Sequence, residues 1–279
     1  MREIDAARVT EAVRDLCVRA CCELPDDVVR ALREAREAEE WPVARDVLDT
    51  ILENVRVAAE DGVALCQDTG LACVFVEVGQ DVHVTGDLRA AIDEGVRRGY
   101  AEGYLRKSTV SDPLRRVNPG DNAPALVTFD VVPGDRLRIC VAPKGAGSEN
   151  MSRLAMLTPA AGREGVVEAV VDAVRQAGPN PCPPVVVGVG VGGNADHAMG
   201  LAKRALLRET GSRNPDPLYA ELERELEGRV SELGVGPQGL GGATTALAVH
   251  VEAMPTHIAC LPVAVALNCH VARHAEVVL

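Results

Sequence analysis

The chain has 279 residues, of which 47% are hydrophobic, so it is long and apolar enough to bury a sizeable core. Its formal net charge of −12 argues against nucleic-acid binding, because phosphate contacts need a basic surface. One Trp, three Tyr and two Phe leave little aromatic surface for stacking on bases or sugars. No apolar run is long enough to span a membrane, and the acidic, helix-like N-terminal residues do not resemble a signal peptide. We therefore expect a cytoplasmic protein with no membrane or nucleic-acid partner.

The first part of the chain is predicted to be mainly helical. Apolar residues recur every three or four positions over residues 3–60, which is the spacing of one buried helix face. A short strand is then expected at 72–79 and a helix near 87–102. Residues 106–124 are polar and rich in Pro, Gly, Arg and Asn, which indicates a long loop.

Strands and helices follow one another irregularly in the rest of the chain. Residues 125–132 and 136–142 read as two strands, and the Pro-Gly-Asp between them predicts a β-hairpin. The other expected elements are a helix near 163–177, a strand at 185–190, helices near 195–210 and 216–233, and strands at 245–253 and 258–267.

Because strands and helices do not alternate strictly, the pattern favours an α+β fold over a doubly wound parallel sheet. We expect a mixed β-sheet surrounded by helices, with a helical N-terminal part over about 1–60. Neither an internal repeat nor a linker-like segment interrupts the sequence. The economical prediction is therefore a single domain over residues 1–279.

Six of the nine cysteines are expected to be small buried hydrophobic residues, as free cysteines commonly are. Three lie in a predicted helix and three lie in apolar runs. The spacing of Cys17 and Cys21 would suit zinc in a helix, but no second pair completes four ligands. The six are Cys17, Cys21, Cys22, Cys73, Cys140 and Cys260.

The other three cysteines, Cys66, Cys182 and Cys269, lie in loops or at strand ends beside Pro, Asn, Gln or Asp. No C-x-x-C spacing occurs, so zinc ribbons, thioredoxin-like sites and ferredoxin-type clusters lack their pattern. Three thiolates around a four-iron cubane would leave one iron open to substrate or water, as Lewis-acid chemistry requires. Spacing alone leaves open the alternative of three unrelated thiols.

A glycine-rich segment and two single residues allow more than one interpretation. Residues 188–193, GVGVGG, match G-x-G-x-x-G, but no later strand supplies the acid that binds ribose, so a tight strand-to-helix turn is favoured. His257 lies in a polar break between two predicted strands, where a structural role is the commoner one. Asp68 could be a turn residue or a catalytic acid.

Several of these segments belong to one ordered series that extends from Cys66 almost to the C-terminus. The series is CQDTG at 66–70, LRKS at 105–108, KGAGSEN at 144–150, PCPP at 181–184, GVGVGGNADHAMGLAKRAL at 188–206, and the segment from GPQGLGG to ALNC at 236–269. In this combination the chain resembles the class I fumarate hydratases and their relatives, the L-tartrate dehydratases. The resemblance reassigns the glycine segment to a structural loop of that family.

The resemblance implies that Cys66, Cys182 and Cys269 hold a [4Fe–4S] cluster. The fourth iron would bind the hydroxyl and a carboxylate of the substrate and help the hydroxyl group to leave. The resemblance also points to Asp68, linked to His257, as part of the acid–base apparatus that moves the proton on the neighbouring carbon.

The same resemblance implies which residues bind the substrate. Arg106 would bind a carboxylate with its planar guanidinium, and Gln67 would add a hydrogen bond. Ala146 and Gly147 would present backbone N–H groups to the other carboxylate. Ala146 replaces the middle glycine of the commoner triple-glycine loop, which puts the fine fit of the substrate in question.

Single-chain members of the family continue into a second domain, whereas this sequence ends at Leu279, soon after the third cysteine. The resemblance therefore implies an alpha subunit that needs a beta subunit, with two copies of each (α2β2). The expected substrate is a small dicarboxylate, with fumarate-to-malate hydration placed ahead of L-tartrate dehydration. The sequence also allows two other functions, namely a cluster-carrying redox sensor and an NAD-dependent oxidoreductase built on residues 185–210.

Overall fold

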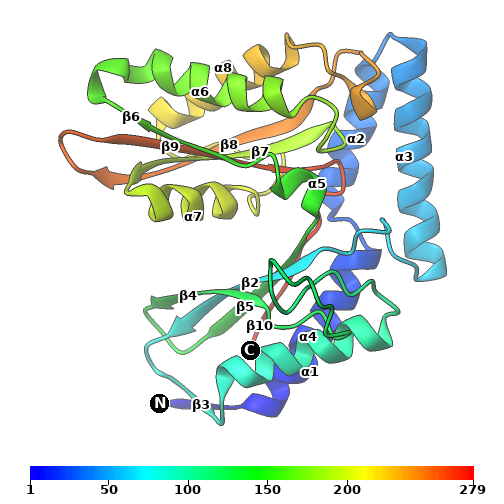
Figure 1. The fold of residues 1–279 in the computed structure, drawn as a ribbon, viewed down its shortest axis with the longest axis vertical. Coiled ribbons are helices and arrows are strands. Elements are labelled where there is room, and N and C mark those ends of the chain that lie inside the picture. Colours follow the sequence, from blue (N-terminus) through cyan, green and yellow to red (C-terminus); the bar gives the residue numbers. More distant parts are fainter. The chain divides into compact units, whose positions relative to one another are not determined.

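The computed structural model describes residues 1–279, and the chain divides into two compact units made of discontinuous segments (Figure 1). Unit 1 comprises Met1–Pro25, Val55–Ala146 and Arg273–Leu279, and unit 2 comprises Asp26–Asn54 and Gly147–Ala272. Both units mix helices with strands of both directions, which confirms the predicted α+β class. The single domain over residues 1–279 stays a prediction.

Unit 1 contains a four-stranded mixed sheet and a separate two-stranded one. Its strands are β1 (Arg2–Asp5), β2 (Leu71–Gly79), β3 (Val82–Thr85), β4 (Leu126–Val132), β5 (Leu137–Lys144) and β10 (Ala275–Val278). The larger sheet has the order β10-β5-β2-β4, with β2 parallel to β4 and antiparallel to β5. The smaller sheet pairs β1 with β3 in parallel.

The β-hairpin predicted around Pro-Gly-Asp is wrong, because β2 lies between β4 and β5. The connection between these two strands crosses the end of β2 instead of closing a tight turn. There the N–H of Gly79 donates to the carbonyl of Arg136 at 2.9 Å, and the N–H of Asp81 donates to that of Gly134 at 2.9 Å. The apolar strand β2 thereby gains a partner on both sides.

Two helices of unit 1, α1 (Ala6–Cys22) and α4 (Leu88–Glu102), pack on the same face of the larger sheet (Figure 1). Asp5 caps α1, because its side chain accepts a hydrogen bond from the N–H of Ala7. The predicted apolar stripe of this helix is buried, and it forms one core with Val74, Ile139 and other strand residues. The end of helix α3 (Pro42–Asp61) also belongs to unit 1.

Unit 2 contains a four-stranded mixed sheet in the order β6-β9-β7-β8. Its strands are β6 (Arg153–Leu157), β7 (Val185–Gly193), β8 (Ala246–Thr256) and β9 (Leu261–Asn268). β7 is central, parallel to β8 and antiparallel to β9. Figure 1 shows helices on both faces of this sheet, with α6 and α8 on one face and α7 on the other. The helices and 3-10 turns are α2 (Asp26–Ala38), the first part of α3, α5 (Ala146–Glu149, whose first residue belongs to unit 1), η1 (Pro159–Ala161), α6 (Gly162–Ala177), α7 (Ala195–Ala205), α8 (Pro217–Ser231) and η2 (Pro237–Gly239).

The G-x-G-x-x-G segment lies within strand β7 and is neither a phosphate-binding loop nor a strand-to-helix turn. Its glycines allow α7 to approach the strand closely. A Cβ atom on Gly190 would lie 2.0 Å from the carbonyl oxygen of Ala198, and one on Gly188 would lie 2.1 Å from that of Ala202. The glycines therefore serve helix–strand packing.

None of the helices is both long and apolar enough to cross a membrane.

Candidate functional site

Asp68 lies in the loop between α3 and β2, and hydrogen bonds from three parts of unit 1 hold its carboxylate. Oδ2 accepts from the N–H of Ala146 at 2.8 Å, and Oδ1 accepts from the N–H of Gly70 at 3.0 Å. The hydroxyl of Ser108 lies 3.5 Å from the same Oδ1. These contacts fix the direction of a half-buried carboxylate.

Glycine at position 70 allows this loop to lie close to the end of β5. Gly70 has φ +73, and a Cβ atom on it would lie 2.7 Å from backbone atoms of Lys144. A larger residue would push the loop away from β5 and so displace Asp68.

Cys66 precedes Asp68 by two residues and is half-buried. Its Sγ atom lies 3.4 Å from the N–H of Asp68, which donates to it. A thiolate that accepts a backbone N–H keeps its remaining lone pairs for another partner.

Five of the six cysteines that were expected to be buried are buried, and several have thiols that resist ionisation. Burial raises the pKa of Cys21 to about 11 and that of Cys140 to about 12. Burial also raises the pKa of the Cys17 and Cys22 thiols. Such thiols are poor metal ligands, because a metal binds the thiolate form.

Cys260 corrects the expectation for the sixth cysteine. It is half-buried, and it lies in the turn between β8 and β9 rather than inside an apolar strand. The strand predicted at 258–267 begins only at Leu261.

Arg106 and Gln67 are both exposed in unit 1, on the two loops that also carry Ser108 and Asp68. The carbonyl of Arg106 accepts a hydrogen bond from the hydroxyl of Thr69 at 2.9 Å, so the backbones of the two loops are joined. The guanidinium of Arg106 forms no ion pair within the chain. An exposed guanidinium in this position can bind an anionic ligand.

Ala146 and Gly147 lie in the one-turn helix α5, and both are exposed. The N–H of Ala146 already donates to Asp68, so in this structure that N–H is not directed to a ligand. A Cβ atom on Gly147 would lie 3.1 Å from the carbonyl oxygen of Asn180. Binding of a substrate carboxylate by these two residues stays a prediction.

Cys182 and Cys269 lie next to each other in unit 2, at the end of the sheet where β7 begins and β9 ends. Strand pairing aligns Val186 with Asn268, the residue before Cys269. The backbone N–H of His270 donates to the carbonyl of Cys182 at 3.2 Å. Cys182 is exposed and has φ +54, and Cys269 is half-buried. The fold therefore gathers two accessible thiols that are 87 residues apart in sequence.

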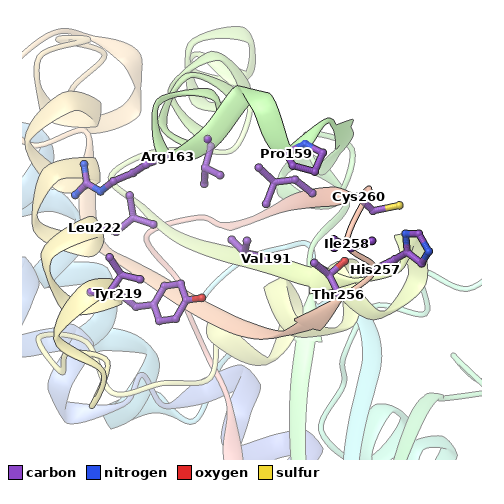
Figure 2. Close-up of a pocket in the computed structure, with 13 residues that line it drawn as sticks. Pro159, Arg163, Val191, Tyr219, Leu222, Thr256, His257, Ile258 and Cys260 are labelled. Carbon is purple, nitrogen blue, oxygen red and sulfur yellow. The ribbon is translucent and has the colours of Figure 1, made fainter.

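His257 lies at the other end of the same sheet, in the turn after β8. Strand β7 has nine residues, and at about 3.3 Å per residue it separates the two ends by about 26 Å. Figure 2 shows His257 and Cys260 at the rim of an apolar cavity of about 440 Å³ beside Val191. The Nδ1 atom of His257 accepts from the N–H of Ala259 at 3.1 Å. Its predicted link to Asp68 stays a prediction, and within unit 2 it lies far from Cys182.

Several residues around these loops were not singled out from sequence. Asn122 and Tyr100 are fully buried, and both donate hydrogen bonds to the carbonyl of Gly70. Arg273 is 4% exposed and donates to the carbonyl of Asp68. The polar character of residues 106–124 was a usable signal for Asn122, but nothing local marked Tyr100 or Arg273.

The three loop cysteines have the chemistry that an iron–sulfur cluster requires, because they are accessible while most of the other thiols are buried. Cys66 lies in unit 1, and Cys182 and Cys269 lie in unit 2. No group of three or more His, Cys, Asp or Glu side chains forms a ready metal site within the structure. The donor types fit the cluster, and the joint use of the three cysteines stays a prediction.

A held carboxylate, an unpaired arginine and accessible thiols are the groups of an enzyme for an anionic substrate, not of a nucleotide-binding protein. The family model described as fumarate hydratase (Fumerase) matches residues 10–278. The chain therefore belongs to the fumarate hydratase family of hydro-lyases, as the resemblance predicted. Hydro-lyases of this family generally depend on an iron–sulfur cluster.

Relatives of known designation match along nearly the full length. A putative L(+)-tartrate dehydratase subunit alpha of Methanocaldococcus jannaschii is 42% identical over 275 residues, 96% of each chain. The L(+)-tartrate dehydratase subunit alpha of Escherichia coli strain K12 is 35% identical over 266 residues, 94% of this chain and 88% of that protein. The protein of the same name from Shigella sonnei matches with the same values.

Proposed function

We propose that this chain is the alpha subunit of a [4Fe–4S]-dependent hydro-lyase that adds water to, or removes it from, a small dicarboxylate. The observation that carries the proposal is the geometry around Asp68. A directed carboxylate lies two residues from an accessible thiol and on a loop joined to the loop of an unpaired arginine. Family membership and the names of the relatives support the same reaction class.

Cys66, Cys182 and Cys269 would hold the cluster. When bound, the cluster supplies a Lewis-acid iron with an open coordination position for the leaving hydroxyl group. The buried cysteines are unsuited to this task, because burial disfavours their thiolates. The backbone N–H of His270, the residue after Cys269, donates to the carbonyl of Cys182 and so helps to hold the two cysteines of unit 2 near each other.

The protein's own groups would bind the substrate and move its proton. Arg106 would bind one carboxylate through paired N–H donors, and Gln67 would donate a further hydrogen bond. Asp68 would take or return the proton on the carbon next to the C–O bond, with the N–H of Ala146 and Gly70 fixing its direction. His257 would be the partner of Asp68 in acid–base chemistry, although it lies at the far end of β7 from Cys182.

Two substrates are proposed, each with its own support. Fumarate, hydrated to malate, is placed first because the matching family is described as fumarate hydratase. L(+)-tartrate is the second candidate because the relatives carry that substrate in their names. Malate and L(+)-tartrate differ by one hydroxyl group, so polar groups that shape the pocket would decide between them.

We also propose a beta subunit as the partner, in an α2β2 enzyme located in the cytoplasm. The support is that the relatives are named as alpha subunits. The structure gives less support to an NAD-dependent oxidoreductase or a redox sensor. The glycines that suggested NAD binding lie inside a strand, and redox sensing would not need a directed Asp68.

The test is anaerobic reconstitution of the chain with iron and sulfide, alone and with the beta subunit encoded with it. Iron content, absorption and the hydration of fumarate and dehydration of L(+)-tartrate are then measured. We expect about four irons per chain and activity only in the complex. A folded complex that binds iron yet acts on neither dicarboxylate would rule out the hydro-lyase, and full activity of the single chain would rule out the need for the partner.

A further inference from the structure

The buried side chain of Asn122 joins two loops of the proposed site in unit 1. One loop, residues 66–70, carries Asp68, and the other, residues 105–108, carries Arg106. Asn122 is 0% exposed and lies at the end of the polar segment that follows the second loop.

Each end of the Asn122 amide is bound to a different loop. Its Nδ2 donates to the carbonyl of Gly70 at 3.1 Å. Its Oδ1 accepts from the N–H groups of Ser108 and Thr109, at 2.6 and 2.9 Å. A buried amide with both ends occupied is a specific connector, because breaking either end leaves a buried polar group without a partner.

We propose that Asn122 is a positioning residue of the hydro-lyase that sets the loop of Arg106 against the loop of Asp68. It thereby fixes the separation between the group that binds a substrate carboxylate and the group that moves the proton. The role rests on the proposed function, because it presumes that Arg106 and Asp68 act on the same substrate.

The neighbouring contacts support a connecting role over a purely local one. Ser108, whose N–H is bound by Asn122, also directs its hydroxyl to Oδ1 of Asp68. Thr69 forms a second connection, because its hydroxyl donates to the carbonyl of Arg106. Asn122 touches neither the carboxylate of Asp68 nor the guanidinium of Arg106 through any of these bonds, so it acts through the backbone of both loops.

The backbone of Asn122 permits a clean substitution. Its φ is +58, a left-handed conformation that asparagine tolerates and glycine adopts readily. Asn122→Gly therefore removes both side-chain bonds without straining the backbone. Asn122→Asp keeps an acceptor for the N–H groups of Ser108 and Thr109 but replaces the donor to Gly70 with an oxygen. It therefore breaks only the hydrogen bond to the loop of Asp68.

The experiment compares both variants with the wild type in the reconstituted complex with the beta subunit. Because a displacement of about 1 Å can cost about 100-fold in rate, we expect kcat/KM to fall by about 10- to 100-fold in both. KM should rise as well as kcat fall, since Arg106 and Asp68 lose their mutual placement. Iron content should stay close to the wild-type value, whereas the melting temperature should fall modestly, because each variant leaves a buried polar group without its partner.

A matched control is available on the exposed side of the same segment. Asn118 donates to the carbonyl of Lys107 at 2.7 Å and is exposed. Asn118→Ala removes a hydrogen bond from the same loop without touching the loop of Asp68, and we expect kcat/KM within about twofold of wild type.

Amide hydrogen exchange distinguishes loss of the hydrogen bond between the two loops from loss of the local fold of residues 108–109. Asn122→Asp should keep the protection of Ser108 and Thr109, and Asn122→Gly should lose it. Activity lost in Asn122→Gly but kept in Asn122→Asp would overturn the proposal, because only the local fold of one loop would then matter. Full activity in both variants would overturn it too. An iron-loaded but inactive wild type would instead overturn the proposed function itself, and this role with it.

Discussion

The two units build the same arrangement of four strands from unrelated stretches of sequence. In each, a central strand has a parallel neighbour on one side and an antiparallel neighbour on the other, and a fourth strand lies antiparallel to the latter. The central strand is β2 in unit 1 and β7 in unit 2. In both units the parallel and antiparallel neighbours are consecutive in the chain, and the central strand is inserted between them.

The units differ in how the sheet is covered. Strand β7 has helices on both faces and is buried over eight of its nine residues. Strand β4 of unit 1 has no buried residue, and Phe129 and Val131 are exposed. The well-covered sheet carries two cysteines at its strand ends, and the less covered one carries polar loops held by buried donors such as Tyr100 and Asn122.

In the proposed enzyme, unit 2 would hold two of the cluster thiols, and unit 1 would supply the hydrogen-bonded groups that bind the substrate and move its proton. A ligand on a strand end is placed by the sheet itself. A catalytic carboxylate on a loop has to be placed by its own hydrogen bonds. Variants of each unit should therefore fail in different ways.

The largest effect is expected for Cys182→Ser in unit 2. A neutral hydroxyl is a poor substitute for a soft thiolate, so the reconstituted chain should lose essentially all of its cluster iron. Iron analysis and absorption after anaerobic reconstitution measure this. Cys260→Ser is the matched control, since that thiol is also partly exposed but lies at the other end of the sheet, and it should keep the iron. Wild-type iron content in Cys182→Ser would remove Cys182 from the ligands.

Asp68→Asn tests unit 1, and here the cluster should stay while turnover is lost. Removing a general acid–base group typically lowers the rate by about 100- to 10,000-fold. The amide has a single oxygen, so it can accept from the N–H of Ala146 or of Gly70 but not from both. The iron content shows whether the loop change reaches the cluster. Steady-state kinetics of the complex, with iron content measured on the same sample, give the answer. Retained turnover would take Asp68 out of the mechanism.

His257→Asn, assayed in the same way as Asp68→Asn, shows whether the histidine belongs to the same machinery. Because we propose that it acts with Asp68, we expect kcat to fall while the iron content stays at the wild-type value. A wild-type rate would end its proposed catalytic role.

Arg106→Met should act mainly on substrate binding. A hydrogen-bonded charge contact contributes about 1.5 to 3 kcal/mol, so KM should rise by about 10- to 150-fold with a smaller change in kcat. Arg115→Met, an exposed arginine in the same polar segment, serves as the control and should leave KM unchanged. An unaltered KM in Arg106→Met would contradict the carboxylate contact.

The elements of this fold could be predicted from sequence more fully than their pairing. The helices of the N-terminal part and the strands β2, β4, β5 and β7 follow from local periodicity, because each buries one face or an apolar run. The strand order could not be obtained this way, because a Pro-Gly-Asp turn signals a reversal but not which strand the chain returns to. The short strands β1, β3, β6 and β10 have too few residues to show a period.

For the site too, local motifs could be predicted from sequence, whereas contacts between distant segments could not. The loop motifs predicted Cys66, Asp68 and Arg106 as site residues through their resemblance to a family. Asn122 and Arg273 escaped notice, because their roles depend on contacts with residues that are distant in sequence: Asn122 lies 52 positions from Gly70, and Arg273 lies 205 positions from Asp68. Buried polar residues that bind the backbone of a loop can be recognised only from the folded structure.

Gly190→Ala tests whether the close packing of helix α7 on strand β7 contributes to stability. The added Cβ would lie 2.0 Å from the carbonyl of Ala198, so α7 must shift, and we expect a loss of about 1 to 3 kcal/mol in the free energy of unfolding. Gly200→Ala is the control in the same helix, because nothing lies within 4 Å of its Cβ. It should be neutral or stabilise by up to about 1 kcal/mol. Urea denaturation measures both, and equal stability of the two variants would contradict the packing role of Gly190.

The smallest expected effect is a pH dependence of stability from His250, which is fully buried in β8 of unit 2. Its Nδ1–H donates to the carbonyl of Ala205 at 3.1 Å, and burial, with the nearby Arg208, lowers its pKa below the usual value. Below a pH of about 6.5 the unfolded chain binds a proton that the folded chain resists, so stability should fall as the pH drops from about 6.5 towards the lowered pKa. His250→Asn keeps a donor but cannot titrate, and its urea midpoint should fall less than that of the wild type between pH 7 and 5. His83→Asn, at an exposed site in unit 1, should follow the wild type, and parallel curves for His250→Asn and wild type would show that burial in the covered sheet does not affect this titration.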